Sequence, residues 1–321
     1  MDAGSIKSYR LVKTKKIEWL WEPYIPMGKI TIIEGDPGDG KTSFVLFLSA
    51  ILSKTNRKIH IDGLTDKKIN IIYQSQEDDS EDTIKPKLIK YGADCSNIYF
   101  VDKESNISLE NGELDKYIKE IKANLVVLDP IQSFLGEKSI TNLTAMRNAL
   151  KRLANIAKEN NCAVILIGHM NKSAKEKDLY RSLGSIDIVA LARSVLLLKR
   201  KEAAPYVRIV FQIKNNLAMQ GAPIAFEFKK GGSINYLGKF AEEDLISEES
   251  GLTKRELSKK LLMSHLLEED TKATTMLDKA KKYSISRRTM DEARKEIGCR
   301  AIKKKDGWYW TMDGNDNGQQ R

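Results

Sequence analysis

The chain has 321 residues, of which 41% are hydrophobic and 31% are charged. This composition is typical of a soluble globular protein and excludes the collagen-like, coiled-coil and low-complexity classes. Lys and Arg outnumber Asp and Glu by 54 to 44, giving a formal charge of +10. Such an excess favours an acidic partner, either nucleic acid or an anionic membrane surface. The length favours two domains.

The cysteines Cys95, Cys162 and Cys299 have neither a CxxC spacing nor a Cys/His pattern. Neither a disulfide framework nor a zinc site is therefore expected, and a reducing cytoplasm fits best. The N-terminus is polar, and no apolar stretch approaches the ~18 residues that a membrane span needs. We expect a cytoplasmic protein that is neither exported nor transmembrane.

Short β-branched runs alternate with segments of helical periodicity over the first 213 residues. The expected strands are 29–34, 69–73, 97–101, 124–128, 163–168, 194–198 and 207–213, and the expected helices are 42–52, 113–122, 144–159 and 186–193. This alternation implies βαβ crossovers, and so predicts an α/β fold with a mostly parallel central sheet and helices on both faces. Residues 214–238 are expected to form antiparallel hairpins.

The composition changes at residues 242–250, which contain five carboxylates and no basic residue. We interpret this segment as a linker between two domains. Beyond it, three helices are expected at 253–265, 272–283 and 287–297. Residues 300–312 then contain a Lys-Asp-Gly turn between β-compatible flanks, which is typical of a hairpin. Three helices followed by a hairpin predict a winged helix-turn-helix.

Residues 35–42 match the pattern GxxxxGK[ST] between an expected strand and an expected helix. The glycines let backbone N–H groups surround phosphates, and the helix adds its positive N-terminal end. Lys41 is expected to reach the β- and γ-phosphates of ATP, and the Thr42 hydroxyl to bind Mg²⁺. The expected nucleotide-binding residues are Gly35, Asp36, Pro37, Gly38, Asp39, Gly40, Lys41, Thr42 and Ser43.

Three polar residues follow expected strands and are candidates for catalysis. Asp129 ends an apolar strand and is expected at the metal, as a ligand or beside one. Glu77 follows the strand 69–73 and is the expected catalytic base, with helix capping as the alternative. His169 follows the strand 163–168 and is expected to sense the γ-phosphate, with an ordinary core histidine as the alternative.

Together these residues resemble the RepA-type, RecA-like hexameric ATPases, a family of plasmid and phage replicative helicases related to the DnaB helicases. The resemblance covers residues 15–238 and is carried by WLWEPYIPMGKITIIEGDPGDGKTS, the Gln-Glu-Asp at 76–78, LVVLDP, ILIGHMNK, RSLGSIDIVALARSVLLL and QIKNNLA. It implies a RecA-like core, a homo-hexamer, ATP and Mg²⁺ as cofactors, and an ATP site completed by an arginine of the neighbouring subunit.

Arg193 is the best match to that arginine and Arg181 is a second match, although Arg193 also fits an ordinary charge at a helix C-terminus. The chain departs from the family at two places. Gly168-His169 stands where RepA-type proteins tend to have paired histidines, and Lys214-Asn215-Asn216 stands where DnaB-like enzymes have Lys-x-Arg. The role of Lys214 is therefore left open.

The resemblance also implies that the loops after the Asp129 and His169 strands hold single-stranded DNA. The second loop carries Lys172, Lys175, Lys177 and Arg181, which would neutralise backbone phosphates. A solvated charged loop is the alternative.

Residues 252–312 contain 16 basic and nine acidic residues, and so hold +7 of the total charge. Ser286 is expected to cap a recognition helix that starts with Arg287 and Arg288, with Lys303, Lys304 and Lys305 on the wing. Trp308 and Trp310 are expected in the core. The module is expected to bind duplex DNA, with protein contacts as the alternative.

The expected organisation is a RecA-like P-loop ATPase domain at 1–241, an acidic linker at 242–252, a winged-helix-like domain at 253–312 and a disordered tail at 313–321. Three functions fit: an ATP-driven motor or helicase on DNA in replication of a mobile element, an ATP-dependent switch or loader without unwinding, and a DNA-binding regulator whose ATPase core serves only assembly. Intact Lys41, Thr42, Glu77 and Asp129 disfavour the third.

Overall fold

The computed structural model describes residues 8–102, 107–109, 112–135, 143–168, 186–201, 204–240, 254–266, 270–282, 285–304 and 306–312. The chain divides into two compact units, Met1–Lys239 and Phe240–Arg321, and each is described by itself. Several predictions fall outside the described residues, namely those for His169, Lys172, Lys175, Lys177, Arg181, Lys305, the linker 242–252 and the tail 313–321.

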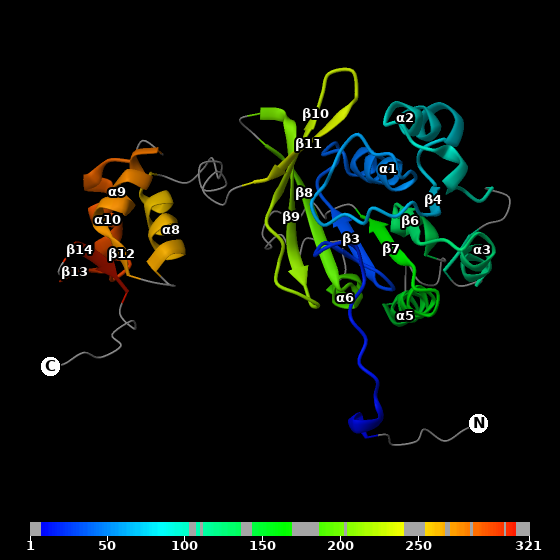
Figure 1. Ribbon diagram of the computed structural model, residues 1–321, viewed down its shortest axis with the longest axis horizontal. Helices are drawn as coiled ribbons and strands as arrows, with labels where there is room; N and C mark the ends of the chain where they lie inside the picture. The colour runs from blue at the N-terminus through cyan, green and yellow to red at the C-terminus, as the bar shows by residue number, and fades with distance from the viewer. Residues whose placement is uncertain are drawn as a thin grey trace. The chain divides into compact units, whose positions relative to one another are not determined.

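The larger unit is built on a sheet that has nine strands within the described residues, in the order β11-β10-β9-β8-β3-β7-β6-β4-β5 (Figure 1). Strands β8, β3, β7, β6, β4 and β5 pair in parallel, whereas β9, β10 and β11 pair antiparallel. The unit thus has the expected RecA-like P-loop α/β fold with a mostly parallel sheet. The strands are β3 (Ile30–Glu34), β4 (Ile71–Ser75), β5 (Ile98–Tyr99), β6 (Leu125–Asp129), β7 (Ala163–Ile167), β8 (Ser194–Lys201), β9 (Ala204–Asn215), β10 (Ile224–Phe228) and β11 (Ile234–Lys239).

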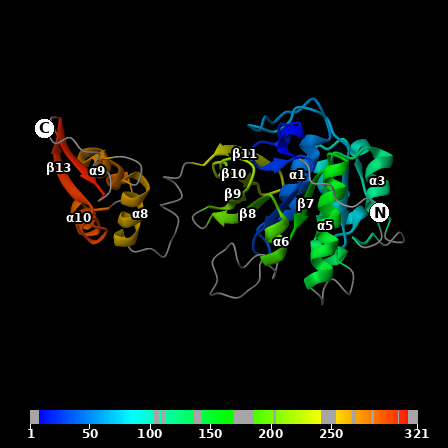
Figure 2. The ribbon, with the colours of Figure 1, turned by 90° about the horizontal axis from the view of Figure 1, so that it is seen from below.

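Helices cover both faces of this sheet and bury its central strands on both sides. On β3, Ile30 and Ile32 pack into one hydrophobic cluster and Ile33 into the other, as the two-residue period of a strand requires. Helices α1 and α2 lie on one face, and α3, α5 and α6 on the other (Figure 1). Figure 2 shows α5 lying along the strands. The helices are α1 (Lys41–Leu52), α2 (Lys85–Lys90), α3 (Glu113–Ile121), α5 (Leu143–Glu159) and α6 (Ile186–Leu191).

A short hairpin that the sequence did not predict precedes β3. It consists of β1 (Trp19–Trp21) and β2 (Ile25–Pro26). Trp21 is fully buried, and its ring contacts those of Tyr24, Phe44 and Phe226. Single turns of helix lie at Tyr9–Leu11 (η1), Ser80–Ile84 (η2), Cys95–Asn97 (η3) and Ile131–Phe134 (η5).

Several expected strands have other boundaries in the structure. The strand expected at 97–101 covers only Ile98–Tyr99, and the strand expected at 194–198 continues to Lys201. The strand expected at 69–73 begins two residues later, at Ile71, and continues to Ser75 because it pairs with β6 as far as Asp129. The strand expected at 207–213 extends over Ala204–Asn215, because its whole length pairs with β8.

Within the described residues no helix has both the length and the apolar character needed to cross a membrane.

The smaller unit contains α8 (Lys254–Leu266), α9 (Ala273–Lys282), α10 (Arg287–Glu296) and a sheet in the order β12-β14-β13. Its strands are β12 (Thr271–Lys272), which the sequence did not predict, β13 (Arg300–Lys304) and β14 (Gly307–Thr311). The Ser286 side chain accepts a 3.1 Å hydrogen bond from the Thr289 N–H, which confirms it as the cap of α10.

Only one of the two tryptophans expected in the core lies there. Trp310 is buried with Leu261, Met276 and Met290. Trp308 is 56% exposed, so its prediction was wrong. Both residues lie on the same face of β14, but β12 pairs only with Tyr309 and Trp310, and Trp308 lies nearer the turn, beyond that pairing.

Candidate nucleotide-binding site

The loop between β3 and α1 needs glycine at two positions. Gly40 has φ of +90°, and a Cβ there would lie 2.8 Å from Phe228 Cε1. A Cβ on Gly35 would lie 2.4 Å from the Leu198 carbonyl oxygen. A residue with a side chain would strain the backbone at Gly40 and would clash at both positions. Residues 35–40 therefore form the tight turn that the phosphate-binding motif predicts.

Lys41, the first residue of α1, is buried inside this loop. Its Nζ donates hydrogen bonds to the carbonyl oxygens of Gly35 (2.7 Å) and Asp36 (3.1 Å). Burial lowers the pKa of Lys41, while the nearby carboxylates of Asp39 and Asp129 oppose that shift. An ammonium group has three donors, so one remains for a phosphate oxygen once the loop carbonyls hold the other two.

Asp129 and Thr42 meet at the carboxyl edge of the sheet. The Thr42 hydroxyl donates to Asp129 Oδ2 over 2.8 Å, and the Tyr73 hydroxyl donates to the same oxygen over 2.9 Å. Burial raises the pKa of Asp129, and these two hydrogen bonds oppose that shift. A hydroxyl and a carboxylate are the hard oxygen ligands that Mg²⁺ takes together with phosphates and water. Thr42 and Asp129 therefore fit the predicted metal.

Glu77 lies two residues beyond the end of β4 and is exposed. Its charge contributes to raising the pKa of both Lys41 and Asp129, so its carboxylate lies within electrostatic range of both groups. The cap of the helical turn η2 is Asp79, whose Oδ1 accepts a 2.8 Å hydrogen bond from the Glu81 N–H. The residue that caps η2 is therefore Asp79 and not Glu77, for which capping was the alternative. The role of Glu77 as the catalytic base stays a prediction.

Arg193 and Lys214 lie at the opposite edge of the sheet from the P-loop. The Arg193 N–H donates to the carbonyl of Ile30, the first residue of β3. The P-loop follows Glu34, the last residue of the same strand. An extended strand of this length separates the two ends by roughly 15 Å. Lys214 Nζ donates to the carbonyls of Val189 (2.7 Å) and Ala190 in α6. Neither cation belongs to the phosphate site of its own chain.

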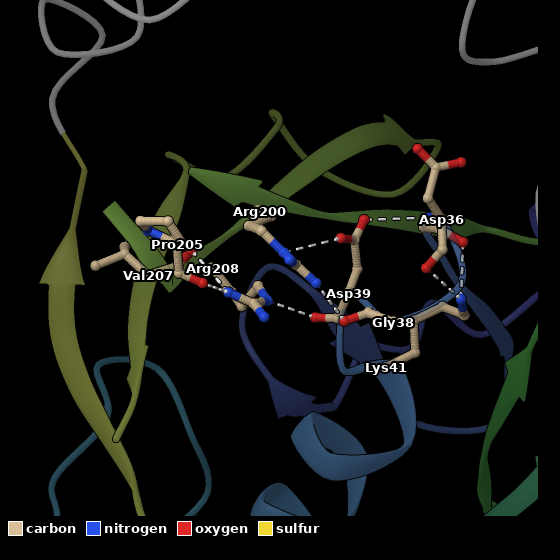
Figure 3. Close-up of polar contacts among 9 residues, drawn as sticks. Asp36, Gly38, Asp39, Lys41, Arg200, Pro205, Val207 and Arg208 are labelled. Carbon is tan, nitrogen blue, oxygen red and sulfur yellow. Dashed lines mark hydrogen bonds and ion pairs between the residues drawn. The ribbon is translucent and has the colours of Figure 1, made fainter. Parts of the chain in front are cut away.

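Sequence reasoning missed four residues at this site. Tyr73 acts on Asp129 as described, and Arg200 and Arg208 contact the P-loop from β8 and β9 (Figure 3). The fourth is Glu34, the last residue of β3, which is fully buried. Tyr73, Arg200 and Arg208 belong to no motif singled out in the sequence, and Glu34 lies in the segment before the P-loop, where a carboxyl group in an otherwise apolar strand was the one available signal.

Glu34 is a buried acid without a hydrogen bond. Neither of its carboxyl oxygens has a partner within the described parts of the chain. Burial raises the pKa of Glu34 to about 8, with the Lys41 charge acting in the opposite direction. The folded protein therefore holds a proton on this side chain at neutral pH.

A glycine-rich loop between a strand and a helix, a buried lysine and a Thr–Asp pair together define a P-loop nucleotide-binding protein. The profile of the AAA domain family AAA_25 matches residues 9–175, and the chain belongs to this family of RecA-like P-loop ATPases.

The chain also matches curated relatives at low sequence identity. The chain is 23% identical over 224 residues to the DNA repair protein RadA of Streptococcus pneumoniae, covering 68% of this chain and 47% of the relative. It is 28% identical over 149 residues to the DNA repair protein RadA of Listeria monocytogenes, covering 45% and 28%. The chain therefore spans less than half the length of these relatives. Among solved structures, the ATPase domain of G40P is 16% identical, with a TM-score of 0.49, over 66% of this chain and 85% of that one.

Proposed function

We propose that the protein is an ATPase that acts on DNA as a ring-shaped oligomer, in which each nucleotide site is completed by an adjacent copy. The observation that carries the proposal is the Thr42–Asp129 hydrogen bond beside the buried Lys41. This hydrogen bond joins the two residues proposed to bind Mg²⁺, and it lies next to the lysine proposed to bind phosphate, at one edge of the sheet. The relatives named as DNA repair proteins support DNA as the partner.

In this proposal each residue has a separate task. Lys41 neutralises charge on the β- and γ-phosphates, and Thr42 and Asp129 hold Mg²⁺, which supplies further positive charge there when bound. Tyr73 keeps the Asp129 carboxylate oriented through its hydrogen bond. Glu77 takes the proton of the attacking water, for which its exposed position near Lys41 and Asp129 is suitable.

The position of Arg193 supports a role in the site of another copy. Because it lies a strand length from its own P-loop, it can reach a γ-phosphate only when a second molecule presents its own loop. A head-to-tail contact joins two different surfaces of identical copies and can close into a ring. Arg193 is proposed as the arginine that stabilises charge on the transferred phosphoryl group, and Lys214 lies beside it.

The finer proposal is a RepA-type replicative helicase of a plasmid, phage or integrative element. The alternative is an ATP-dependent switch or loader that does not unwind DNA. Asn216 favours this alternative, because it stands where DnaB-like enzymes have an arginine. Lys214 also donates to two helix carbonyls, which leaves it one further donor.

The smaller unit is proposed to be a winged helix that binds duplex DNA. The side chains of Arg287 and Arg288, on the first turn of α10, are 80% and 90% exposed. They pair with Asp291 and Glu292 one turn later. Such exposed pairs are weak, so phosphates can replace the carboxylates at little cost. Protein binding through the same basic face is the alternative.

The decisive experiment measures ATP hydrolysis with and without single-stranded DNA, followed by unwinding of a forked duplex. A motor hydrolyses faster with DNA and separates the strands, and a switch hydrolyses without separating them. Hydrolysis indifferent to DNA would overturn the proposed action on DNA.

A mixing experiment tests the shared site. Lys41→Ala and Arg193→Ala proteins should each be inactive alone, but mixed oligomers should recover part of the activity. Copies with Lys41→Ala still supply Arg193 to the intact loops of copies with Arg193→Ala. Lys68→Ala is the matched control, because this exposed lysine precedes β4 at the same sheet edge as Arg193. Absence of recovery would reject Arg193 as the shared arginine.

A further inference from the structure

Two arginines on neighbouring strands contact the P-loop of their own chain (Figure 3). Arg200 of β8 lies directly opposite Arg208 of β9 in the antiparallel pair. Arg208 Nε donates a 2.8 Å hydrogen bond to the carbonyl of Asp39, and Arg200 Nη2 donates a 3.0 Å hydrogen bond to the carbonyl of Gly38. The two side chains thus hold consecutive carbonyl groups of the loop.

Holding a carbonyl also fixes the N–H of the next residue. The peptide unit is planar, and in its trans form the C=O and N–H point in opposite directions. Arg208 therefore turns the Gly40 N–H away from its own guanidinium group. That N–H has no hydrogen-bond partner in the described parts of the chain, and it belongs to the group of N–H donors that surround phosphates in this motif.

The preceding turn is closed by bonds of its own. The Asp39 N–H donates to the Asp36 carbonyl over 3.2 Å, and the Asp36 N–H donates to Asp39 Oδ2 over 3.1 Å. Arg200 supports this turn from outside through the Gly38 carbonyl, and its Nε lies 3.9 Å from Asp39 Oδ1. The two arginines and the turn form one bonded unit.

Arg208 is the rigid member of the pair. It is only 8% exposed, and its Nη1 donates to the carbonyls of Pro205 and Val207 within β9. Its guanidinium carbon lies 5.1 Å from the centre of the Phe228 ring, the same ring that lies against Gly40. The planar group is therefore fixed by stacking and by three acceptors.

The arrangement is unfavourable for the sheet alone. Like charges directly opposite on adjacent strands repel. Burial and the charge of Arg200 both lower the pKa of Arg208, and only the Asp39 carboxylate opposes them. A pair that costs folding stability, aimed at a phosphate-binding loop, points to a role in that loop.

We propose that Arg200 and Arg208 are positioning residues for the nucleotide of their own chain, which hold Asp36–Gly40 in the conformation that receives the diphosphate of ADP or ATP. They act through the loop carbonyls and keep the N–H donors oriented before the ligand arrives, so that the ligand does not have to order them. The inference rests on the proposed function only in requiring that the P-loop binds a nucleotide. It also separates these arginines from Arg193, which serves a second copy.

The first test is direct binding of ADP and AMP to the full chain without hydrolysis. Arg208→Ala should weaken ADP binding about tenfold or more, the effect of losing a hydrogen bond to a charged group. AMP, which lacks the β-phosphate, should lose much less affinity. Arg208→Lys should not restore ADP binding, since one ammonium cannot span the acceptors that the guanidinium joins. Arg200→Ala should also weaken ADP binding more than AMP binding, because the Gly38 carbonyl loses its partner, and Arg200→Lys should restore part of the ADP affinity.

Lys229→Ala is the matched control, since Lys229 is an exposed cation just beyond β10 that pairs with Glu227 rather than with the loop. Thermal unfolding without nucleotide identifies variants that only lose stability. If ADP and AMP affinities fall equally, or if Arg208→Ala binds ADP as the natural protein does, the inference is wrong. If the natural protein itself binds no ADP, the proposed function fails instead.

The second test places the arginines in their own chain. At ATP concentrations that only partly fill the sites, mixed oligomers of Arg208→Ala and Lys41→Ala should hydrolyse ATP no faster than the Arg208→Ala protein alone, because neither component contains an intact site. Mixed oligomers of Arg193→Ala and Lys41→Ala serve as the positive control. Recovery in the Arg208→Ala mixture would show that Arg208 acts on a neighbour's nucleotide, and would overturn the inference.

Discussion

The Thr42 hydroxyl and the Asp129 carboxylate are joined by a 2.8 Å hydrogen bond across 87 positions of the sequence. They meet because β6 and β3 run in the same direction in one sheet, so that Asp129 and the start of α1 reach the same edge. The Tyr73 hydroxyl from β4 binds the same carboxylate oxygen. The pair proposed to bind Mg²⁺ is thus held in place by three separate elements.

Replacing Thr42 by Val should lower the Mg²⁺-dependent ATPase rate about 10- to 100-fold, since the variant loses a hydrogen bond to a charged group and a metal ligand. Thr42→Ser should keep most of the activity, because it keeps the hydroxyl. The rate measured against Mg²⁺ concentration gives the comparison. Equal rates for the Val and Ser variants would contradict the role of the hydroxyl.

Lys41→Ala should weaken ADP and ATP binding about 100-fold or more, because a buried ammonium group that neutralises phosphate is lost. Calorimetric titration with ADP measures the affinity. Lys54→Ala provides the control, as Lys54 follows the same helix but its Nζ donates to the Gly92 carbonyl, away from the loop. Unchanged ADP affinity in Lys41→Ala would contradict the assignment of the site.

Glu34→Gln should change how stability depends on pH. The pKa of Glu34 is raised to about 8 in the folded protein, so the folded state keeps a proton that the unfolded state releases above its ordinary value near 4.5. The free energy of unfolding is therefore highest at low pH, where Glu34 is protonated in both states, and it falls as the pH rises from about 4.5 to about 8. The uncharged Gln does not titrate, so the variant should be more stable at pH 8.5 by up to roughly 5 kcal/mol. Urea denaturation at pH 4.5, 7 and 8.5 provides the measurement, and parallel curves for the two proteins would refute the prediction.

Gly40→Ala should destabilise the protein by more than the roughly 1–2 kcal/mol that a left-handed backbone costs an alanine. The additional cost arises because its Cβ would lie 2.8 Å from Phe228. Gly112→Ala is the matched control, with φ of +75° and no atom within 4 Å of the added Cβ. Equal losses of unfolding free energy in the two variants would show that the Phe228 contact does not matter.

The double variant Arg287→Ala, Arg288→Ala should weaken duplex DNA binding and reduce the slope of log affinity against log salt by about 2, one for each lost phosphate contact. Lys281→Ala, which removes an exposed cation of α9, is the control. Binding measured over a salt series distinguishes the outcomes. An unchanged slope would favour the use of this basic face for protein contacts.

The local parts of the site could be predicted from the sequence. The left-handed backbone at Gly40, the helix that starts at Lys41 and the cap at Ser286 depend on interactions within a few residues. The β-branched runs, such as the one that ends at Asp129, also predicted a buried parallel sheet, because such strands are apolar on both faces. Trp308 shows where this reasoning fails, since alternation defines a face but not how far the covering helices extend.

Short-range patterns in the sequence predict the P-loop, the parallel core and the candidate ligands Thr42 and Asp129. The distant groups that complete the site come together only through the pairing of strands far apart in the chain. Arg200 and Arg208 lie 162 and 169 positions from the carbonyls they hold, and only the register of β8 and β9 brings them there. Lys214 lies near the end of β9 and Arg193 directly precedes β8, so both lie at the opposite edge of the sheet. The pairing of distant strands sets these positions, and this pairing cannot be predicted from sequence patterns within a few residues.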